Sequence, residues 1–410
     1  MKISLVVPNR NNLKYFKWSY DSIRKNQGNH DVYICSAADF CDDGTVEYYK
    51  ELAEKDDKFS YIVNEGPTRI GHTILYDAII NELVKTDVFM IWHCDMYLCP
   101  KAIDYIEKYI IPGTVVSLTR IEPPLHPPGP EKLTQPFGQE PEEFKEKELL
   151  KWFNDTKFNR KDKVTEGIFA PWAIYKNDHT SNGGHDDLLS RQSKEDSDQF
   201  NRFLLNGYKF IQTWEGCVYH LTCRGSRFNP TLTTVGTDSN EWLTQNNRSS
   251  RNFIRKWGHF VKHNDTMKPI VPKRYDVGFV VINCNEYTLA LLEPWCDKIY
   301  TDVEYDRYIK GEQKNTKFDL KKKLFRYDDP KTNDIIVQFD AVKLTNQSFE
   351  FFNNLSLMIE DSGQIGELEY DIYKIKIKNM TDYSKNLINI NDKWYQNKLS
   401  KEQIIPYPIP

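Results

Sequence analysis

SKEDSDQFNRFLLNGYKF, Ser193–Phe210, places three carboxylates within four residues, at Glu195, Asp196 and Asp198. Apolar residues then recur at helical spacing, and the Asn-Gly pair at 206–207 is typical of a left-handed helix end, so the acids begin a helix. Carboxylates at a helix N-terminus complement the positive end of the helix dipole by about 0.3–1 kcal/mol each. Because neighbouring acids repel one another, this role accounts for one or two of them. The alternative is a site that accepts a proton or faces hydroxyl groups.

Upstream, the chain alternates four times between short apolar runs and segments with helical spacing. Such runs are typical of buried parallel strands, and their alternation with helices predicts an α/β fold around a mostly parallel central sheet. The four runs are KISLVVPN at 2–9, DVYICSAAD at 31–39, KFSYIVNEG at 58–66 and DVFMIWHCD at 87–95.

Two segments interrupt this pattern and indicate the domain organisation. A proline-rich stretch at 121–141 has a composition that is typical of a functional loop or of a disordered segment. Polar residues and two prolines mark a linker at 263–273. We therefore expect one domain over residues 1–262, a smaller α/β or β-rich domain over 274–390, and a tail over 391–410.

The composition excludes several classes of protein. The 410 residues carry a net charge of only -4 and no block of five basic residues, so a nucleic-acid partner is not expected. No apolar run approaches the roughly 18 residues that a membrane span needs, and the N-terminal apolar stretch is too short for a signal peptide. The eight cysteines are scattered without a C-x-x-C pair, which is typical of reduced thiols. We expect a cytoplasmic protein that is soluble or peripheral to a membrane.

His93 and Asp95 lie two residues apart at the carboxyl end of the fourth apolar run. Ligands of parallel α/β sheets bind beyond the carboxyl ends of the strands, and side chains two apart on a strand point the same way. An imidazole and a carboxylate together suit Mn²⁺ at least as well as Mg²⁺. The alternative is a polar turn at a strand end. His220, which follows another predicted strand, is either a third ligand or an ordinary surface or core histidine.

The segment NGGHDD at 182–187 precedes the acidic motif. Paired glycines allow the backbone to approach a ligand closely, although on their own they are also typical of a simple turn.

Together these features resemble the family-2 glycosyltransferases of the GT-A fold, over about residues 1–260. ISLVVPNRNN is similar to their opening strand and turn, and CDDGTVEYYKEL to the segment with D-G-T before the second helix. IWHCDMYLCP lies where the family has its D-x-D strand end. GGHDD followed by EDSDQFNRFLLNGYKF closely resembles the family's G-G-F-D-E and E-D-x-D-L-x-x-R-L motifs. The E-D-x-D motif with its helix is the specific part of the match.

The resemblance implies catalytic and metal-binding roles for particular residues. Asp196 matches the catalytic base of inverting transfer, which takes a proton from the acceptor hydroxyl as its oxygen attacks the sugar. Glu195 beside it and Asp198 would position the acceptor. Asp95 matches the last acid of D-x-D, whereas His93 replaces the first acid and Cys94 the middle residue. The expected cofactor is Mn²⁺ or Mg²⁺, which would bridge the nucleotide diphosphate, with His93, Asp95 and His220 as ligands.

The resemblance also implies where the substrates bind. Asp39 corresponds to the acid that faces a uracil base, although Ala38 stands where many relatives have a second acid. The expected nucleotide-binding residues are Pro8, Asn9, Arg10, Asp39, Arg69, Gly71 and Cys94. Trp172 is either a stacking platform for an acceptor sugar or a core residue. The expected acceptor-binding residues are Trp172, Gly183, Gly184, Asp186 and Asp198. The insert at 121–141 is interpreted as a lid over donor or acceptor.

The function that follows is inverting, metal-dependent glycosyl transfer of the hexosyltransferase type, within glycan biosynthesis. The expected donor is a UDP-sugar and the expected acceptor is a hydroxyl of a glycan or glycoconjugate, with a homo-oligomer formed through the C-terminal domain. One alternative is a nucleotidyltransferase, but VVPNRNN lacks the glycine-rich basic signature of that class. Another is a degenerate transferase that binds glycans or serves in assembly. His93 favours that alternative, and the intact E-D-S-D motif argues against it.

Overall fold

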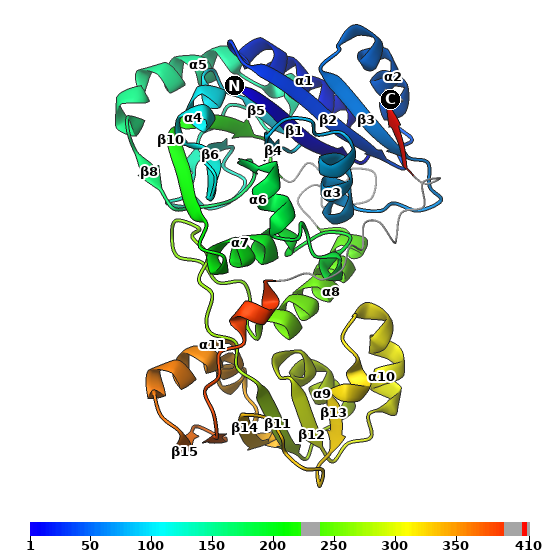
Figure 1. Cartoon of the computed structure of the whole chain (residues 1–410), viewed down its shortest axis with the longest axis vertical. Coiled ribbons are helices and arrows are strands. Elements are labelled where there is room, and N and C mark those ends of the chain that lie inside the picture. The colour runs from blue at the N-terminus through cyan, green and yellow to red at the C-terminus, as the bar shows by residue number, and fades with distance from the viewer. Residues whose placement is uncertain (223–237, 389–403, 408–410) are drawn as a thin grey trace. The chain divides into compact units, whose positions relative to one another are not determined.

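The computed structural model describes residues 1–222, 238–388 and 404–407 (Figure 1). These residues form two compact units, each with its own sheet. Unit 1 comprises the described residues of Met1–Thr244, His263–Pro269 and 404–407. Unit 2 comprises those of Gln245–Lys262 and Ile270–Asn389. The expected α/β class, with a mostly parallel central sheet and a second smaller sheet, is confirmed.

The four apolar runs form the parallel centre of the unit 1 sheet, in the order β3-β2-β1-β4. Helices α1 and α2 lie on one side of this sheet and α3 on the other, so the strands are buried on both faces (Figure 1). The elements are β1 (Lys2–Asn9), α1 (Leu13–Asn26), β2 (Asp31–Asp39), α2 (Thr45–Lys55), β3 (Phe59–Asn64), α3 (His72–Glu82), β4 (Val88–Ile91) and α4 (Ala102–Tyr109).

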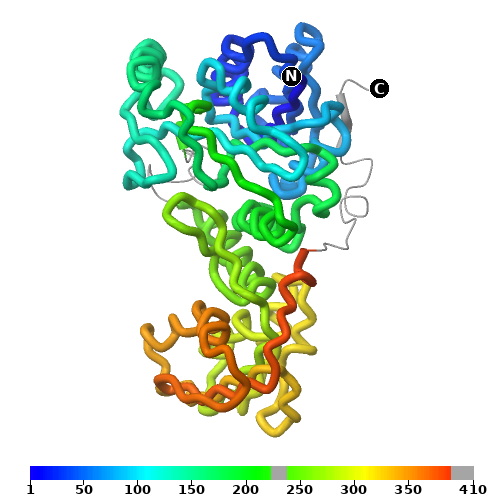
Figure 2. The backbone as a smooth tube through the Cα atoms, turned by 60° about the vertical axis from the view of Figure 1, so that its left-hand side comes forward, coloured from blue at the N-terminus to red at the C-terminus, as the bar shows by residue number. Residues whose placement is uncertain are grey.

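The rest of the unit 1 sheet extends beyond β4, where β9 pairs antiparallel with both β4 and β6. Strand β10 runs parallel to β6, and β5 runs antiparallel to β10. The remaining strands are β5 (Met96–Leu98), β6 (Thr114–Glu122), β7 (Leu133–Thr134), β8 (Val164–Thr165), β9 (Trp172–Tyr175), β10 (Lys209–His220) and β17 (Ile404–Tyr407), which pairs with β3. The helices are α5 (Glu146–Asp155), α6 (Lys176–Ser181) and α7 (Glu195–Leu205), while α8 (Asn240–Trp257) begins in unit 1 and continues into unit 2. In Figure 2 the blue and cyan segments all lie within unit 1.

Unit 2 has a smaller sheet in the order β13-β12-β11-β14-β16-β15. The first four strands in this order are parallel, and β16 and β15 close the sheet as an antiparallel pair. Of the two alternatives expected for this region, α/β or β-rich, the structure of unit 2 has the α/β type. Its elements are β11 (Val277–Ile282), α9 (Glu286–Leu292), β12 (Lys298–Thr301), α10 (Asp306–Glu312), β13 (Leu324–Arg326), β14 (Ile335–Asp340), α11 (Asn346–Ser362), β15 (Gly366–Tyr370) and β16 (Tyr373–Ile377).

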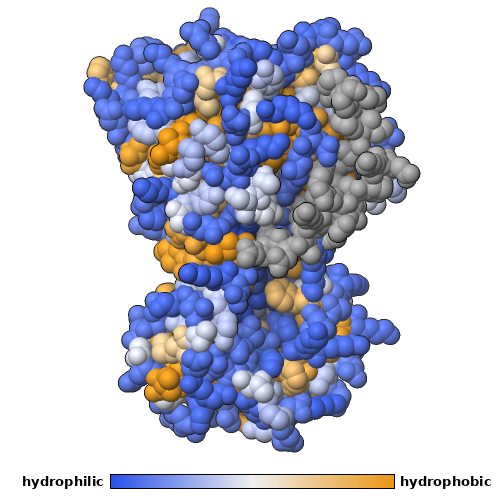
Figure 3. All heavy atoms as spheres, viewed as in Figure 1, coloured by the Kyte–Doolittle hydropathy of each residue, from blue (hydrophilic) through white to orange (hydrophobic). Residues whose placement is uncertain are grey.

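The surface of each unit is mostly hydrophilic in the view of Figure 3, with separate small apolar spots. Within the described ranges, no helix has both the length and the apolar character that crossing a bilayer requires.

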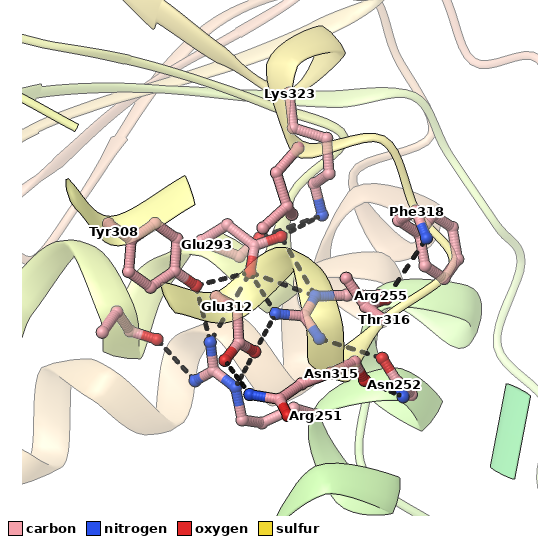
Figure 4. A network of polar contacts seen from close by, with 12 residues as sticks. Arg251, Asn252, Arg255, Glu293, Tyr308, Glu312, Asn315, Thr316, Phe318 and Lys323 are labelled. Carbon is pink, nitrogen blue, oxygen red and sulfur yellow. Dashed lines mark hydrogen bonds and ion pairs between the residues drawn. The ribbon is translucent and has the colours of Figure 1, made fainter. Parts of the chain in front are cut away.

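Residues 245–262 belong to unit 2, although the sequence placed them with the N-terminal domain. The reason is a buried ionic network that α8 forms with the segment around Glu293 (Figure 4). The Arg255 guanidinium lies 2.6 Å from Glu293 and 2.5 Å from Glu312. Lys323 lies 2.7 Å from Glu293 on another side. Arginines within an amphipathic helix give no sequence signal for such distant partners, so the pattern alone could not assign this helix to unit 2.

We predict that this network dominates the stability of unit 2. The Glu293 carboxylate is fully buried, so Glu293→Gln leaves Arg255 and Lys323 without their main counter-charge. Breaking a buried pair in this way costs about 3–5 kcal/mol. Urea denaturation followed by circular dichroism measures the change in the free energy of unfolding.

The matched control is Glu304→Gln, which removes an equally short ion pair, 2.6 Å to Arg326, from an exposed position of the same unit. Solvent screens such pairs, so the control should unfold like the unchanged protein. Equal stability of the two variants would contradict the role given to Glu293.

Candidate active site

A cavity of about 470 Å³ lies in unit 1, where β1, β2 and β4 end and α3 and α7 begin. A larger hollow of about 950 Å³ lies at the opposite, amino ends of the strands and is lined by residues such as Lys2, Lys58 and Lys85. Because ligands of parallel α/β sheets bind beyond the carboxyl ends, we place the site in the smaller cavity. It also contains the three expected metal ligands and two of the acids of the motif, Glu195 and Asp196.

His93, Asp95 and His220 converge at one side of this cavity. Their ligand atoms all lie within 4.8 Å of one another, and His220 Nε2 is 3.3 Å from Asp95 Oδ1. The convergence follows from strand register, because the antiparallel pairing of β5 with β10 sets His220 opposite Met96, next to Asp95. Two imidazoles and one carboxylate are a donor set that suits a first-row divalent metal. The three residues therefore fit the expected cofactor.

The electrostatics of this cluster differ between its two histidines. Burial lowers the pKa of His93 to about 4, so its imidazole is neutral and available as a ligand. Burial also opposes the charging of His220, but the carboxylates of Asp95 and Glu122 outweigh it and raise the pKa of His220 to about 9. His220 is thus held strongly by two acids.

Glu122 is a residue that the sequence analysis missed. It ends β6, is 2% exposed, and its Oε1 lies 3.1 Å from His220 Nδ1. Arg120 at 3.2 Å and Lys132 at 3.0 Å neutralise it, and together with the hydrogen bond from His220 they lower the pKa of Glu122 despite its burial. A carboxylate on the far nitrogen of a metal-ligating histidine fixes the tautomer and orientation of the ring. No motif marks such a partner, because it lies 98 positions away in the chain.

The three acids of α7 have three different environments. Glu195 Oε1 lies 2.9 Å from Nε2 of His72, the first residue of α3. Asp198 does not line the cavity and forms a fully buried ion pair, 2.8 Å, with Arg202. Asp196 lines the cavity, and within the described part of the chain its buried Oδ1 has no hydrogen-bond partner. The three neighbouring acids therefore differ in their partners. Glu195 is bound by a histidine, Asp198 is paired with an arginine, and Asp196 lines the cavity with an oxygen that has no such partner among the described residues.

Burial and the neighbouring charge of Glu195 together raise the pKa of Asp196 to about 7. Burial opposes ionisation of Glu195, but the charge of the His72 imidazole and its hydrogen bond favour ionisation, so the pKa of Glu195 is lowered. A carboxylate whose pKa lies near neutrality is suited to accept a proton at physiological pH. His72 was not selected from the sequence, where a single histidine after a glycine gives no signal.

The expected nucleotide-binding residues come together as a group. All seven line the cavity: Pro8, Asn9, Arg10, Asp39, Arg69, Gly71 and Cys94. Asp39 also has a local structural task, because its carboxylate accepts hydrogen bonds from the backbone N–H groups of Ile70 and Gly71 at 2.8 and 2.9 Å. This contact fixes the loop that leads into α3 and leaves the role of Asp39 toward a base as a prediction.

The expected acceptor-binding residues do not line the cavity. Trp172 is 0% exposed and packs edge-on against Phe200 and Phe203, so its side chain lies in the core of unit 1. Gly184 has φ +70°, and a Cβ there would lie 2.5 Å from Asp77 Oδ2. The glycine pair thus lets the backbone approach a buried carboxylate. The other members of the set are Gly183, Asp186, which caps a short 3₁₀ turn, and Asp198, which pairs with Arg202.

Comparisons with known proteins give only distant similarity. No family model matches the sequence, and no curated protein matches it. Among solved structures, a mannosyltransferase from Pyrobaculum calidifontis in complex with GDP-Man and Mn²⁺ is 13% identical, with a TM-score of 0.41 over 62% of this chain and 63% of that one. S. aureus TarS in complex with UDP-GlcNAc is 14% identical, with a TM-score of 0.37 over 54% of this chain and 61% of that one.

GalNAc-T7 with UDP, GalNAc and Mn²⁺ is 12% identical, with a TM-score of 0.43 over 62% of this chain and 48% of that one. The chain therefore spans less than two thirds of the length of each of these three proteins. Scores this low assign neither a family nor a function to this chain.

We predict that Glu122 governs metal affinity through His220. Glu122→Gln keeps the size of the side chain but removes the charge that orients and polarises the imidazole. Loss of such an outer partner weakens metal binding by about 10–100-fold. Titration calorimetry with Mn²⁺ on the full chain measures the dissociation constant.

Glu140→Gln serves as the control, because Glu140 is held by Lys14 at 2.9 Å and does not line the cavity. We expect unchanged Mn²⁺ affinity in this variant. Unchanged affinity in Glu122→Gln as well would show that Glu122 does not act on the cluster.

Proposed function

We propose that this protein is an inverting, metal-dependent glycosyltransferase of the family-2 type, which transfers a sugar from a nucleotide-diphosphate donor to a hydroxyl group. One observation carries the proposal. A cluster of two imidazoles and a carboxylate and an open carboxylate with a pKa near 7 line the same cavity. Metal-assisted departure of a diphosphate and deprotonation of an incoming hydroxyl are the two tasks of this reaction, and the cavity offers a group for each.

The donor end of the cavity contains the metal-ligand cluster. His93, Asp95 and His220 would hold Mn²⁺ or Mg²⁺, which stabilises the negative charge that develops on a departing diphosphate. Arg69 lines the same cavity and adds a positive charge beside Asp39. Glu122 keeps His220 oriented from the side away from the cavity. These residues bind and orient the donor; they do not themselves react.

The acceptor end is formed by the start of α7. Asp196 accepts the proton of the acceptor hydroxyl, the hydroxyl oxygen forms a bond to the anomeric carbon, and the bond from that carbon to the diphosphate oxygen breaks. The electron pair of the broken bond leaves with the nucleotide diphosphate. Because there is a single displacement, the configuration at the anomeric carbon is inverted. Glu195, fixed by His72, keeps Asp196 basic through its negative charge.

The donor is proposed to be a UDP-sugar and the acceptor a glycan or glycoconjugate, with the reaction in the cytoplasm. The direct test is a panel of nucleotide sugars and Mn²⁺, read by thermal shift and by release of nucleotide diphosphate. We expect one donor class to raise the melting temperature and to be turned over only with the metal. If no nucleotide sugar binds or reacts, the protein is not a glycosyltransferase. Release of pyrophosphate from a nucleoside triphosphate would instead identify a nucleotidyltransferase.

We predict that activity depends on the ionisation of Asp196. The rate should rise as the pH increases through about 7, because the base must be deprotonated. Asp196→Asn should lower kcat by roughly 10²–10⁴-fold while the donor still binds. Initial rates across pH, together with donor binding by thermal shift, separate these effects.

A second variant tests the cause of the raised pKa of Asp196. Glu195→Gln removes the adjacent negative charge, so the midpoint of the pH–rate profile should move to lower pH by about one unit or more. Burial is the larger cause and remains, so the midpoint stays above about 3.9, the ordinary value for aspartate. A midpoint that does not move, or that moves upward, would contradict the electrostatic role of Glu195.

A further inference from the structure

A second cluster of metal-ligating side chains lies in unit 1, apart from the cavity. It consists of Asp77 on α3, His179 on α6, and His185 in the segment after the glycine pair. One ligand atom from each lies within 4.8 Å of the others. None of the three lines the cavity described above.

The cluster is closed to solvent. Asp77 is 5% exposed, His179 2% and His185 0%. Aromatic rings surround the imidazoles: Tyr76 stacks on His185 with ring centroids 5.1 Å apart, and Phe89 meets His179 edge-on at the same distance. In such surroundings an ionised carboxylate requires a nearby positive charge, because burial without one is costly.

Within the described residues, neither a lysine nor an arginine forms an ion pair with Asp77; its charged partners are the two histidines only. Arg202 is engaged elsewhere, with Asp198 at 2.8 Å and with the backbone oxygens of Asn182 and Gly184. The positive charge that balances Asp77 is therefore either a proton shared with an imidazole or a metal cation bound by all three residues.

Two observations favour the cation. His179 Nε2 is buried and has no hydrogen-bond partner in the described part of the chain, yet it lies only 3.6 Å from Asp77 Oδ1. If the balancing charge were a shared proton, His185 alone would be enough to hold it, because His185 Nδ1 lies 2.7 Å from Asp77 Oδ1. That hydrogen bond gives no role to His179, whose imidazole is directed at the same oxygen of Asp77. A metal ion would use His179 as a ligand.

We propose that Asp77, His179 and His185 form a second, structural site for a divalent transition metal, with Zn²⁺ as the best match. Zn²⁺ takes imidazole nitrogens and carboxylate oxygens in closed sites and prefers four donor atoms. Two imidazole nitrogens and the two carboxylate oxygens supply them. Binding requires Asp77 Oδ1 and His185 Nδ1 to separate slightly, because the metal replaces the proton between them.

The position of this site gives it a structural task. His185 follows the glycine pair and precedes α7, which begins at Glu195. Asp77 belongs to α3, the helix whose first residue, His72, holds Glu195. A metal bound by these three residues would link α6 and the segment after the glycine pair to α3. It would thereby hold in position the side of the cavity on which Asp196 lies. The proposal is independent of glycosyl transfer, because it concerns metal bound by the protein in any state of the reaction.

The test separates the two metal sites by mutation. His220→Ala in the full chain removes a ligand of the cavity cluster and leaves the second cluster intact. After loading with Zn²⁺ and removal of free metal, elemental analysis should find about one Zn²⁺ per chain in this variant, as a single closed site binds one ion. The double variant His220→Ala with His179→Gln should retain none.

Co²⁺ provides a second measurement, which does not require the metal to stay bound while free metal is removed. In His220→Ala it should give the intense visible absorption of a four-coordinate site, which His179→Gln removes. Circular dichroism and thermal unfolding of metal-free samples confirm that both variants fold. Absence of stoichiometric Zn²⁺ and of the Co²⁺ spectrum in folded His220→Ala would overturn the proposal and leave a proton as the balancing charge. Equal metal content with and without His179 would overturn it as well.

Discussion

The pairing of β5 with β10 is the constraint on which the candidate site depends. It brings residues 96 and 220 opposite each other, and so sets an imidazole from the end of one strand against a carboxylate that precedes the other. The parallel pairing of β10 with β6 then brings Glu122 behind the same imidazole. Three segments that are far apart in the chain thereby converge, and a shift of one residue in either register would turn the side chains to the opposite face.

The acidic start of α7 shows how one helix end can carry carboxylates for different purposes. A helix dipole stabilises negative charge there in general, but it does not distinguish one acid from the next. The distinction comes from the partners: His72 for Glu195 and Arg202 for Asp198. Asp196 has neither, and burial beside the charged Glu195 raises its pKa. Structural carboxylates and a candidate base can thus occupy the same turn.

Local patterns predicted the parallel strands of unit 1 and the helix of the acidic motif with its Gly207 end, because each depends on neighbours in sequence. The residues expected at the nucleotide came from the family resemblance instead, and they line the cavity. Glu122 and His72 depend on partners about a hundred positions away, so no local pattern could select them. Trp172 was ambiguous for a related reason. The sequence around an aromatic residue on a strand is the same whether its ring packs on a helix or faces a sugar. Only the tertiary packing distinguishes the two roles.

Histidine in place of an acid at position 93 changes the chemistry of the metal-ligand cluster. Two carboxylates would give the ligand set a formal charge of −2, whereas Asp95 with two imidazoles, which bind a metal in their neutral form, gives −1. The weaker negative field reduces the attraction for a hard cation such as Mg²⁺, which prefers oxygen ligands. Imidazole nitrogen favours the later first-row metals over Mg²⁺. The lower charge also repels an anionic diphosphate less, so under the proposed function this departure from the D-x-D pattern would favour a nucleotide-sugar donor held through Mn²⁺.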